Sequence, residues 1–351
     1  MSGSSPSVCA DAGAHAEPAV IELAHGSGGR LTHALIDEIF RPAFGAAPED
    51  LTHDGATLAL EAGSERLAFT TDSYVVRPLF FPGGDIGSLS IHGTVNDLAM
   101  CGAEPRYLSV GLVIEEGLRI DVLRSVIASM RAAASASAVR IVTGDTKVVE
   151  RGKGDGLYVN TAGVGVVRAR SPIGPQQVQP GDAVILSGDV GRHGMAILAL
   201  REGIRFETEI VSDCAPLAAQ ALGMIDADIE IHCLRDLTRG GLATNLIEIA
   251  EIAGATIALD EGAIPISDVV RGACEILGLD PLYVANEGRF AAIVPTEHAS
   301  AALAHLRRFD SQAAIIGRVD RGAGHARVLL RTLGGTRELD MLNGEQFPRI
   351  C

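Results

Sequence analysis

The last residue of the chain, Cys351, carries a thiol beside the free C-terminal carboxylate. It follows Pro348-Arg349-Ile350, and Gly344 lies seven peptide steps before it. Those steps span roughly 25 Å when extended, and Gly334-Gly335 offers a second flexible point. A thiol on such a tether can take up a chemical group in one place and present it in another. The alternative is a frayed terminus with an incidental cysteine.

Four aspartates at predicted turns and strand ends indicate a metal site in the first half of the chain. Asp72 and Asp145 each follow a predicted strand, so their side chains can converge at one edge of a sheet. Carboxylate oxygens are the ligands that Mg²⁺ prefers, with water and phosphate completing its octahedron. Each aspartate alone is more often a cap or turn residue. Together, Asp54, Asp72, Asp97 and Asp145 favour a metal–nucleotide site.

Two further side chains could act on protons or on developing charge. Lys147 follows Asp145 by two positions, and both therefore project from the same face of an extended segment. A lysine there can neutralise a phosphate or stabilise a transition state, although it can also be a solvated surface residue. Glu287, between Asn286 and Gly288, is a candidate base if it faces a cleft and is otherwise an exposed loop residue.

Glycine-rich segments provide candidate phosphate sites. The backbone N–H groups of residues 25–29, His-Gly-Ser-Gly-Gly, could close over phosphates, although such a run can also be a linker. Residues 234–241 end in Gly-Gly before a predicted helix and could form an anion-binding corner, and residues 187–194 are built similarly. No GxxxxGK[ST] motif and no dinucleotide fingerprint occurs, which argues against Walker-type and Rossmann sites.

Composition narrows the class of protein. The 351 residues are 47% hydrophobic, enough for two domains with their own cores, and no apolar run approaches the roughly 20 residues that span a bilayer. The net charge of −15 argues against nucleic-acid binding, which needs a basic face. Six cysteines without paired spacing are typical of a reducing compartment. We therefore expect a cytoplasmic protein that binds neither nucleic acid nor membrane.

Strands and helices mix in both halves, which predicts an α+β fold. We expect helices over 31–40, 86–101, 121–137, 191–201, 241–253, 269–277 and 299–309. Strands are expected over 67–72, 107–114, 140–143 (short and buried), 157–168, 183–187, 256–259, 289–294, 314–319 and 327–330. The Pro- and Gly-rich segment 171–181 marks the domain boundary. The predicted parts are a disordered extension 1–20, domains 21–170 and 181–335, and a flexible tail 336–351.

These segments together resemble the HypE family of hydrogenase-maturation carbamoyl dehydratases, within the AIR synthetase (PurM-like) superfamily. The resemblance covers residues 21–351. It rests on HGSGG (25–29), TTDSYVV (70–76), NDLAMCGAEP (96–105), TGDTKVV (143–149), SGDVGRHG (187–194), RDLTRGGLA (235–243), NEGR (286–289) and the terminal PRIC. The aspartate and glycine motifs are typical of the whole ATP-using superfamily, and the terminal cysteine distinguishes this branch. The segment 343–348 is longer than the corresponding part of the usual family tail, and it contains fewer aliphatic residues.

The resemblance implies an activity. The C-terminal thiol would receive a carbamoyl group from the carbamoyltransferase HypF. ATP would then phosphorylate the carboxamide oxygen, and loss of phosphate would leave a thiocyanate. The cyano group would pass to iron on the HypC–HypD maturation complex of nickel–iron hydrogenase. The family fold is two α+β domains, and a homodimer through the first domain is expected.

The resemblance also implies roles for residues. The catalytic set would be Cys351, Lys147 and Glu287, with the last two removing N–H protons. ATP would contact Gly26, Ser27, Gly28, Gly29, Asp72, Asn96, Asp97, Gly144, Asp145 and Thr146. The ligands of Mg²⁺ would be Asp54, Asp72, Asp97 and Asp145.

Two alternatives remain open from the sequence. The first is another ATP-using member of the superfamily, of the selenophosphate synthetase or thiamine-phosphate kinase type. Against the former, Cys9 lies far ahead of Gly26, and no lysine precedes Lys147. The second is a thiol carrier whose tail ferries a group that is modified elsewhere. A carrier would show no dehydration of the tail.

Overall fold

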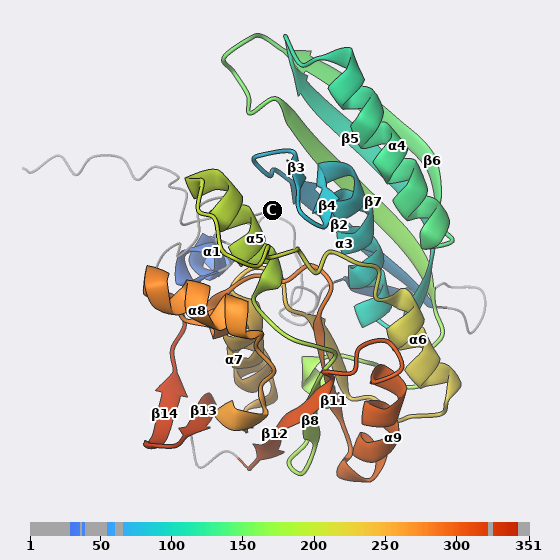
Figure 1. The fold of residues 1–351 in the computed structure, drawn as a ribbon. Helices are drawn as coiled ribbons and strands as arrows, with labels where there is room; N and C mark the ends of the chain where they lie inside the picture. Colours follow the sequence, from blue (N-terminus) through green and yellow to red (C-terminus); the bar gives the residue numbers. More distant parts are fainter. Residues whose placement is uncertain (1–28, 36, 39–54, 60–65, 322–325, 343–351) are drawn as a thin grey trace, which may run out of the picture.

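The computed structural model describes residues 29–35, 37–38, 55–59, 66–321 and 326–342. Two separate sheets with flanking helices form the body of the molecule (Figure 1), and the predicted α+β class is confirmed. The predicted extension 1–20, the loop residues Gly26, Ser27 and Gly28, the metal candidate Asp54 and the terminal Cys351 lie outside the described residues.

The first sheet has five strands in the order β1-β2-β7-β5-β6. All neighbours are antiparallel except β5 and β6. Helices α3 and α4 pack together and cover one face, while the other face carries exposed Phe69, Tyr107 and Val113. The bounds are β1 Ala56–Ala59, β2 Arg66–Tyr74, β5 Ala103–Glu115, β6 Arg140–Val149, β7 Leu157–Val167, α3 Ile86–Met100 and α4 Ile120–Ala136.

Helix α3 joins the two domains. Asp85 caps its start, accepting from the N–H groups of Gly87 and Ser88, while the Ser88 hydroxyl accepts from the Asp85 N–H. Nearly all of α3 is buried because it packs against β2 and β7 on one side and against α6 and β9 of the second domain on the other. A helix covered on all sides must be apolar around its whole circumference. Its few polar residues therefore need partners.

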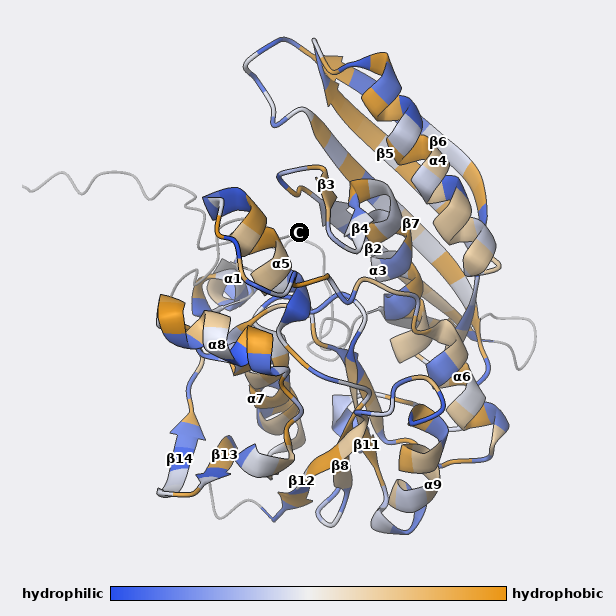
Figure 2. Cartoon of the chain, in the orientation of Figure 1, coloured by the Kyte–Doolittle hydropathy of each residue, from blue (hydrophilic) through white to orange (hydrophobic). Residues whose placement is uncertain are grey.

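The second sheet has seven strands in the order β14-β13-β10-β12-β8-β11-β9. Its central strands are apolar on both faces (Figure 2) because helices cover both. Along β8, Val184 and Leu186 pack with α7, whereas Ala183 and Ile185 pack with α6 and α9. The strands are β8 Ala183–Leu186, β9 Cys233–Asp236, β10 Thr256–Asp260, β11 Phe290–Val294, β12 Ala314–Asp320, β13 Arg327–Thr332 and β14 Gly335–Leu339.

The remaining elements are the helices of the second domain and several short pieces. The helices are α5 Arg192–Glu202, α6 Ala218–Asp226, α7 Gly241–Ala253, α8 Asp268–Leu277 and α9 Thr296–Leu306. The short pieces are α1 Arg30–Leu35, β3 Phe80–Phe81, β4 Gly84–Asp85 and the 3₁₀ turns Pro175–Gln177, Glu261–Ala263 and Pro281–Tyr283. No helix in the described ranges is both long and apolar enough to cross a bilayer.

One predicted strand needs correction. The strand expected to be short and buried over 140–143 is the ten-residue edge strand β6, which is exposed along almost its whole length. It pairs only with β5, and no described strand pairs with its outer edge. Of the helix expected over 31–40, the described part is α1, Arg30–Leu35, followed by Asp37 and Glu38 in π-helical conformation; residues 36, 39 and 40 lie outside the described residues. Strand β9, helix α6 and strand β14 were not predicted.

The flexible tail was predicted to begin at residue 336, but the chain is ordered beyond that position. Residues 335–339 form β14, which pairs with β13 in a hairpin around Gly335. Beyond it, the Asp340 carbonyl accepts a hydrogen bond of 2.8 Å from the Tyr283 hydroxyl, and Met341 and Leu342 pack on the apolar core. The chain is therefore anchored as far as Leu342. Nine further peptide steps to Cys351 could span at most roughly 30 Å.

Candidate functional site

Carboxyl groups from both domains meet at the junction between them, and we call these the junction cluster: Asp72, Asp97, Asp213, Asp236 and Glu287. Burial raises the pKa of Glu287 well above its ordinary value, and Asp236, Asp72 and Asp213 raise it further, against Arg239. The pKa of buried Tyr74 is raised by burial first and then by Asp72 and Asp97. Close, partly buried negative charge of this kind favours bound cations.

The first domain presents two carboxylates on the helix-covered side of its sheet. Asp72 lies near the end of β2, where one oxygen accepts from the Ser73 N–H at 2.8 Å. Asp97, on α3, accepts from the Thr70 hydroxyl at 2.8 Å. Because α3 packs directly on β2, the structure brings these two predicted ligands to the same side.

Asn96, the neighbour of Asp97, faces the second domain. Its side-chain carbonyl accepts from the Leu217 N–H at 2.7 Å, and its amide donates to the carbonyls of Ala215, at 3.1 Å, and Glu287, at 3.4 Å. Protein backbone thus engages both ends of a side chain predicted to contact ATP. Asn96 holds the second domain onto α3.

Asp145 and Lys147 lie on the opposite, exposed face of the first sheet. Strand register places Asp145 in one row with Gly111, Asn160 and Ser73, whose side chains share a face. The Lys147 ammonium is 3.4 Å from an Asp145 carboxylate oxygen, and both side chains are largely exposed. These residues line a hollow of about 360 Å³. The sheet therefore separates this pair from Asp72 and Asp97.

The other predicted nucleotide contacts are distributed along the first domain. Gly144 pairs closely with β5, where an added Cβ would lie 2.3 Å from the Val110 carbonyl oxygen. Thr146 is exposed on β6. Of the predicted phosphate loop, Gly29 is described, buried just before α1. Helix α1 is fixed to the second domain by His33, whose Nε2 lies 3.0 Å from a Glu248 carboxylate oxygen.

The sequence did not single out three charged residues of the junction. Asp236 ends β9, and Arg239 stands in the turn before α7, where Gly240 and Gly241 adopt positive φ. Both belong to the segment predicted as an anion-binding corner, and this prediction could have identified them as site residues. Asp213 lies in an irregular segment without a motif, and no local pattern distinguishes it.

The donor set tests whether the junction suits a metal. Carboxylate oxygens are hard ligands that suit Mg²⁺, and one buried oxygen of Asp213 has no hydrogen-bond partner in the part of the chain that the structure describes. Within the described ranges, however, no three His, Cys, Asp or Glu side chains stand close enough to hold a metal by themselves. Asp72 and Asp97 fit Mg²⁺ as partial ligands, which phosphate and water would complete. Asp145, on the opposite face, does not join them.

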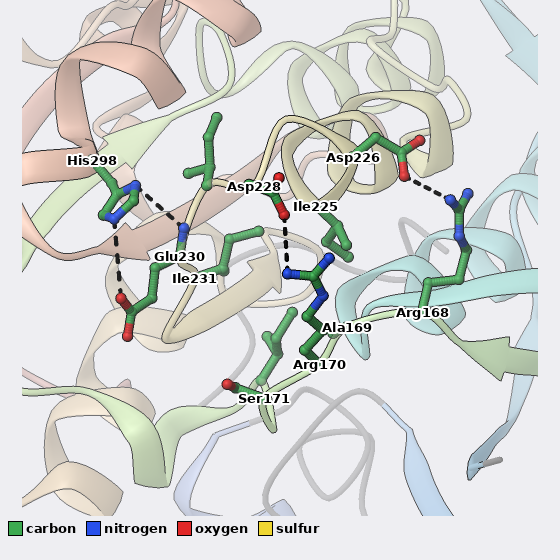
Figure 3. A pocket seen from close by; sticks show the side chains of 12 residues that line it. Arg168, Ala169, Arg170, Ser171, Ile225, Asp226, Asp228, Glu230, Ile231 and His298 are labelled. Carbon is green, nitrogen blue, oxygen red and sulfur yellow. Dashed lines mark hydrogen bonds and ion pairs between the residues drawn. The ribbon is translucent and has the colours of Figure 1, made fainter. Parts of the chain in front are cut away.

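A second hollow, of about 540 Å³, lies beside the interdomain linker (Figure 3). Arg168 pairs with Asp226 at 2.6 Å, and Arg170 pairs with Asp228 at 3.3 Å. The ion pairs join the linker to the end of α6. His298 and Glu230 also line the hollow, with His298 Nε2 4.0 Å from a Glu230 carboxylate oxygen.

Two family models match the chain. The N-terminal domain of AIR synthase related proteins matches residues 52–167, and the C-terminal domain of the same proteins matches residues 179–329. The carbamoyl dehydratase HypE of Azotobacter vinelandii is 50% identical over 334 residues, which cover 94% of this chain and 97% of that protein.

Solved structures are similar over most of their length. The crystal structure of a HypE–HypF complex contains a chain with a TM-score of 0.82 and 40% identity, over 88% of this chain and 100% of that one. A structure of hydrogenase maturation protein HypE in complex with ATP gives a TM-score of 0.79 and 47% identity, over 93% of this chain and 98% of that one.

Proposed function

Because the chain belongs to the HypE family of AIR synthase related proteins, we propose that it is an ATP-dependent carbamoyl dehydratase that acts on its own C-terminal cysteine. Identity of 50% to a named carbamoyl dehydratase over nearly the full chain is the observation that carries this proposal. The ATP complex of a relative supports ATP as the co-substrate. The sequence supplies the terminal thiol that the reaction needs.

The reaction converts an S-carbamoyl group into a thiocyanate. An amide oxygen is a poor leaving group, so transfer of the γ-phosphoryl group of ATP to it makes elimination possible. The carbon–oxygen bond then breaks, phosphate leaves, and the nitrogen loses its two protons as the carbon–nitrogen triple bond forms. Cys351-S-CO-NH₂ and ATP give Cys351-S-CN, ADP, hydrogen phosphate and one released proton, with no change of oxidation state in the protein.

Glu287 is the residue that we assign to proton removal from the nitrogen. Its backbone is held at the domain junction, and its side chain is buried among other carboxylates. A raised pKa makes a carboxylate a stronger base once it has lost its proton. Arg239 and any cation bound at the junction favour the deprotonated form.

Asp72 and Asp97 are the residues that would hold Mg²⁺ with the phosphates of ATP. When bound, Mg²⁺ supplies charge neutralisation for the polyphosphate. We keep Asp54, Thr146 and the glycines 26–29 and 144 as proposed contacts. Asp145, on the opposite face of the sheet, is not kept as a ligand of this Mg²⁺. For Asn96, its hydrogen bonds to the second domain make an indirect role the better account.

A homodimer completes this proposal. Lys147 and Asp145 lie on the exposed face of the first sheet, away from Glu287 in the same chain. That face also exposes Phe69 and Tyr107, apolar surface that a second copy would cover. A second copy seated there could bring Lys147 to the junction site of its neighbour.

Partners follow from the family. The HypE–HypF complex of a relative supports HypF as the carbamoyl donor, and the HypC–HypD complex is proposed as acceptor of the cyano group. The described cysteines Cys214 and Cys274 are free thiols, which fits the reducing compartment that we propose.

The proposal is tested by incubating carbamoylated protein with MgATP and measuring the mass of the C-terminal peptide. A loss equal to one water at Cys351 is expected. A thiol carrier would retain the carbamoyl mass, and a kinase or selenophosphate synthetase would leave this peptide unchanged.

A further inference from the structure

An irregular segment of the second domain, residues 211–217, runs through the domain junction, and we call it the junction strap. Its Ser212 N–H donates to the Pro82 carbonyl at 2.9 Å, and its Leu217 N–H donates to Asn96 at 2.7 Å. Both acceptors belong to the first domain. The strap has no helix or strand of its own, so these bonds fix its course.

Asp213, in the middle of the strap, contacts the backbone at Glu287. One carboxylate oxygen accepts from the Glu287 N–H at 3.2 Å and from the Gly288 N–H at 3.0 Å. The Glu287 carbonyl in turn accepts from the Ala215 N–H at 3.4 Å. The two segments approach so closely that a Cβ on Gly288 would lie 1.9 Å from the Asp213 carbonyl oxygen. Only glycine fits there.

The residues on either side of Glu287 are held as firmly. Asn286 accepts from the Gly191 N–H at 2.7 Å and donates to the Leu237 carbonyl at 3.0 Å. Arg289 pairs with Asp189 at 2.7 Å and with Asp310 at 2.9 Å. The loop is therefore fixed at both ends, and Asp213 fixes its centre.

We propose that Asp213 is a positioning residue for Glu287, acting through its two backbone hydrogen bonds and through the orientation of the junction strap on Asn96. This inference rests on the proposed role of Glu287. Asn96 connects α3, which carries Asp97, to the same strap. The strap therefore fixes the position of Glu287, the proposed base, relative to Asp97, the proposed Mg²⁺ ligand. A displacement of about 1 Å in such a site typically costs about a hundredfold in rate.

Asp213 also contributes negative charge. The charged groups that face Glu287 are Asp236 on β9, Asp72 on β2, Asp213 on the strap and Arg239 before α7. The second Asp213 oxygen is buried and has no hydrogen-bond partner among the described residues. Like Asp236 and Asp72, Asp213 raises the pKa of Glu287, which makes Glu287 a stronger base once that group is ionised.

Two substitutions separate geometry from charge. Asp213→Asn keeps an oxygen that can accept both N–H groups but removes the negative charge. Asp213→Ala removes both. Asp260→Asn is the matched control, because the Asp260 side chain also accepts a backbone N–H, that of Gly262 at 3.0 Å, at an exposed position away from the junction.

The first measurement is amide hydrogen exchange of the full chain without ATP. We expect exchange of the Glu287 and Gly288 amides to quicken by about tenfold or more in Asp213→Ala, and to stay at the wild-type rate in Asp213→Asn and Asp260→Asn. Unchanged exchange in Asp213→Ala would overturn the positioning role without reference to activity.

The second measurement is single-turnover dehydration of carbamoylated protein. We expect Asp213→Ala to lower the rate at saturating ATP by about tenfold to a hundredfold with little change in the ATP concentration for half-maximal rate. We expect Asp213→Asn to move the pH profile to lower pH. Wild-type rates and pH profiles in both variants would overturn the inference. No dehydration in the wild type would instead refute the proposed function, and the exchange result would still stand.

Discussion

Lys147 and Glu287 lie on opposite sides of the five-stranded sheet. Lys147 projects from the exposed face of β6 beside Asp145, whereas the Glu287 backbone is hydrogen-bonded to Asn96 of α3, on the covered face. Two residues that the family resemblance assigns to one proton-transfer step are thus separated within one chain. Both can serve the same reaction if Lys147 comes from a second copy.

Subunit mixing tests this arrangement. Lys147→Ala and Glu287→Gln are each expected to be inactive, whereas an exchanged mixture should regain about a quarter of wild-type activity. Half of the dimers are then mixed, and each has one site with both residues intact. Dehydration is read by mass. Recovery no greater than in a mixture of Glu287→Gln and Glu287→Ala would show that the two residues do not act across a dimer.

The pH dependence of the rate distinguishes a base from an acid at Glu287. Because burial and neighbouring carboxylates raise its pKa, a basic role predicts a rate that increases with pH well above the ordinary carboxyl range. The rate should reach a plateau once the group is ionised. Single-turnover rates from pH 5 to 9 provide the measurement, and a rate that falls over this range would assign the acid role instead.

Glu287 is also expected to lower stability. The pKa of Glu287 is higher in the folded protein than in the unfolded chain. As pH rises between these two pKa values, the unfolded chain releases the proton while the folded protein keeps it, so the free energy of unfolding falls. Glu287→Gln should therefore raise the melting temperature at pH 8 and change it little near pH 4. Equal melting temperatures for the two proteins at pH 8 would contradict the raised pKa.

His92 makes the fold sensitive to acid. Burial lowers its pKa to about 4 from the model-compound value of 6.5, and its Nδ1 lies 3.6 Å from the Cys214 sulfur. Below pH 6.5 the unfolded chain binds a proton that the folded chain excludes, so stability falls as pH drops toward 4. The loss between pH 7 and 5 should be about 2 kcal/mol. Urea unfolding of His92→Asn should show a smaller loss.

Much of the fold could be predicted where local pattern decides it. Helix α7 has the predicted bounds, Gly241–Ala253, because glycines with positive φ flank an apolar periodic run. Strand β8 was predicted from its short apolar run. The exposure of β6 could not be predicted, because an apolar strand at an open edge has the same sequence as a buried one. Residues 335–339 contain little apolar pattern, and their pairing with β13 sets their structure.

The site could be predicted only in part, again because tertiary pairing decides where several of its residues lie. Asp72 and Asp145 were both predicted to follow a strand, but Asp145 lies in the middle of β6. Which face each side chain occupies depends on register across four strands. Asp213 has no local signal, since its importance comes from a contact with Glu287 at a separation of 74 positions. Asn96 was identified from its motif. Its hydrogen-bond partners lie in the other domain, and the sequence did not predict them.

The most direct test is the fate of the carbamoyl group on Cys351 in a single turnover with MgATP, followed by mass spectrometry of the C-terminal peptide and by ADP release. We predict that wild-type protein loses the mass of one water from that peptide, with one ADP formed per thiocyanate, and that Glu287→Gln retains the carbamoyl group. ADP formation without loss of water in the wild type, or loss of water in Glu287→Gln at the wild-type rate, would contradict this account.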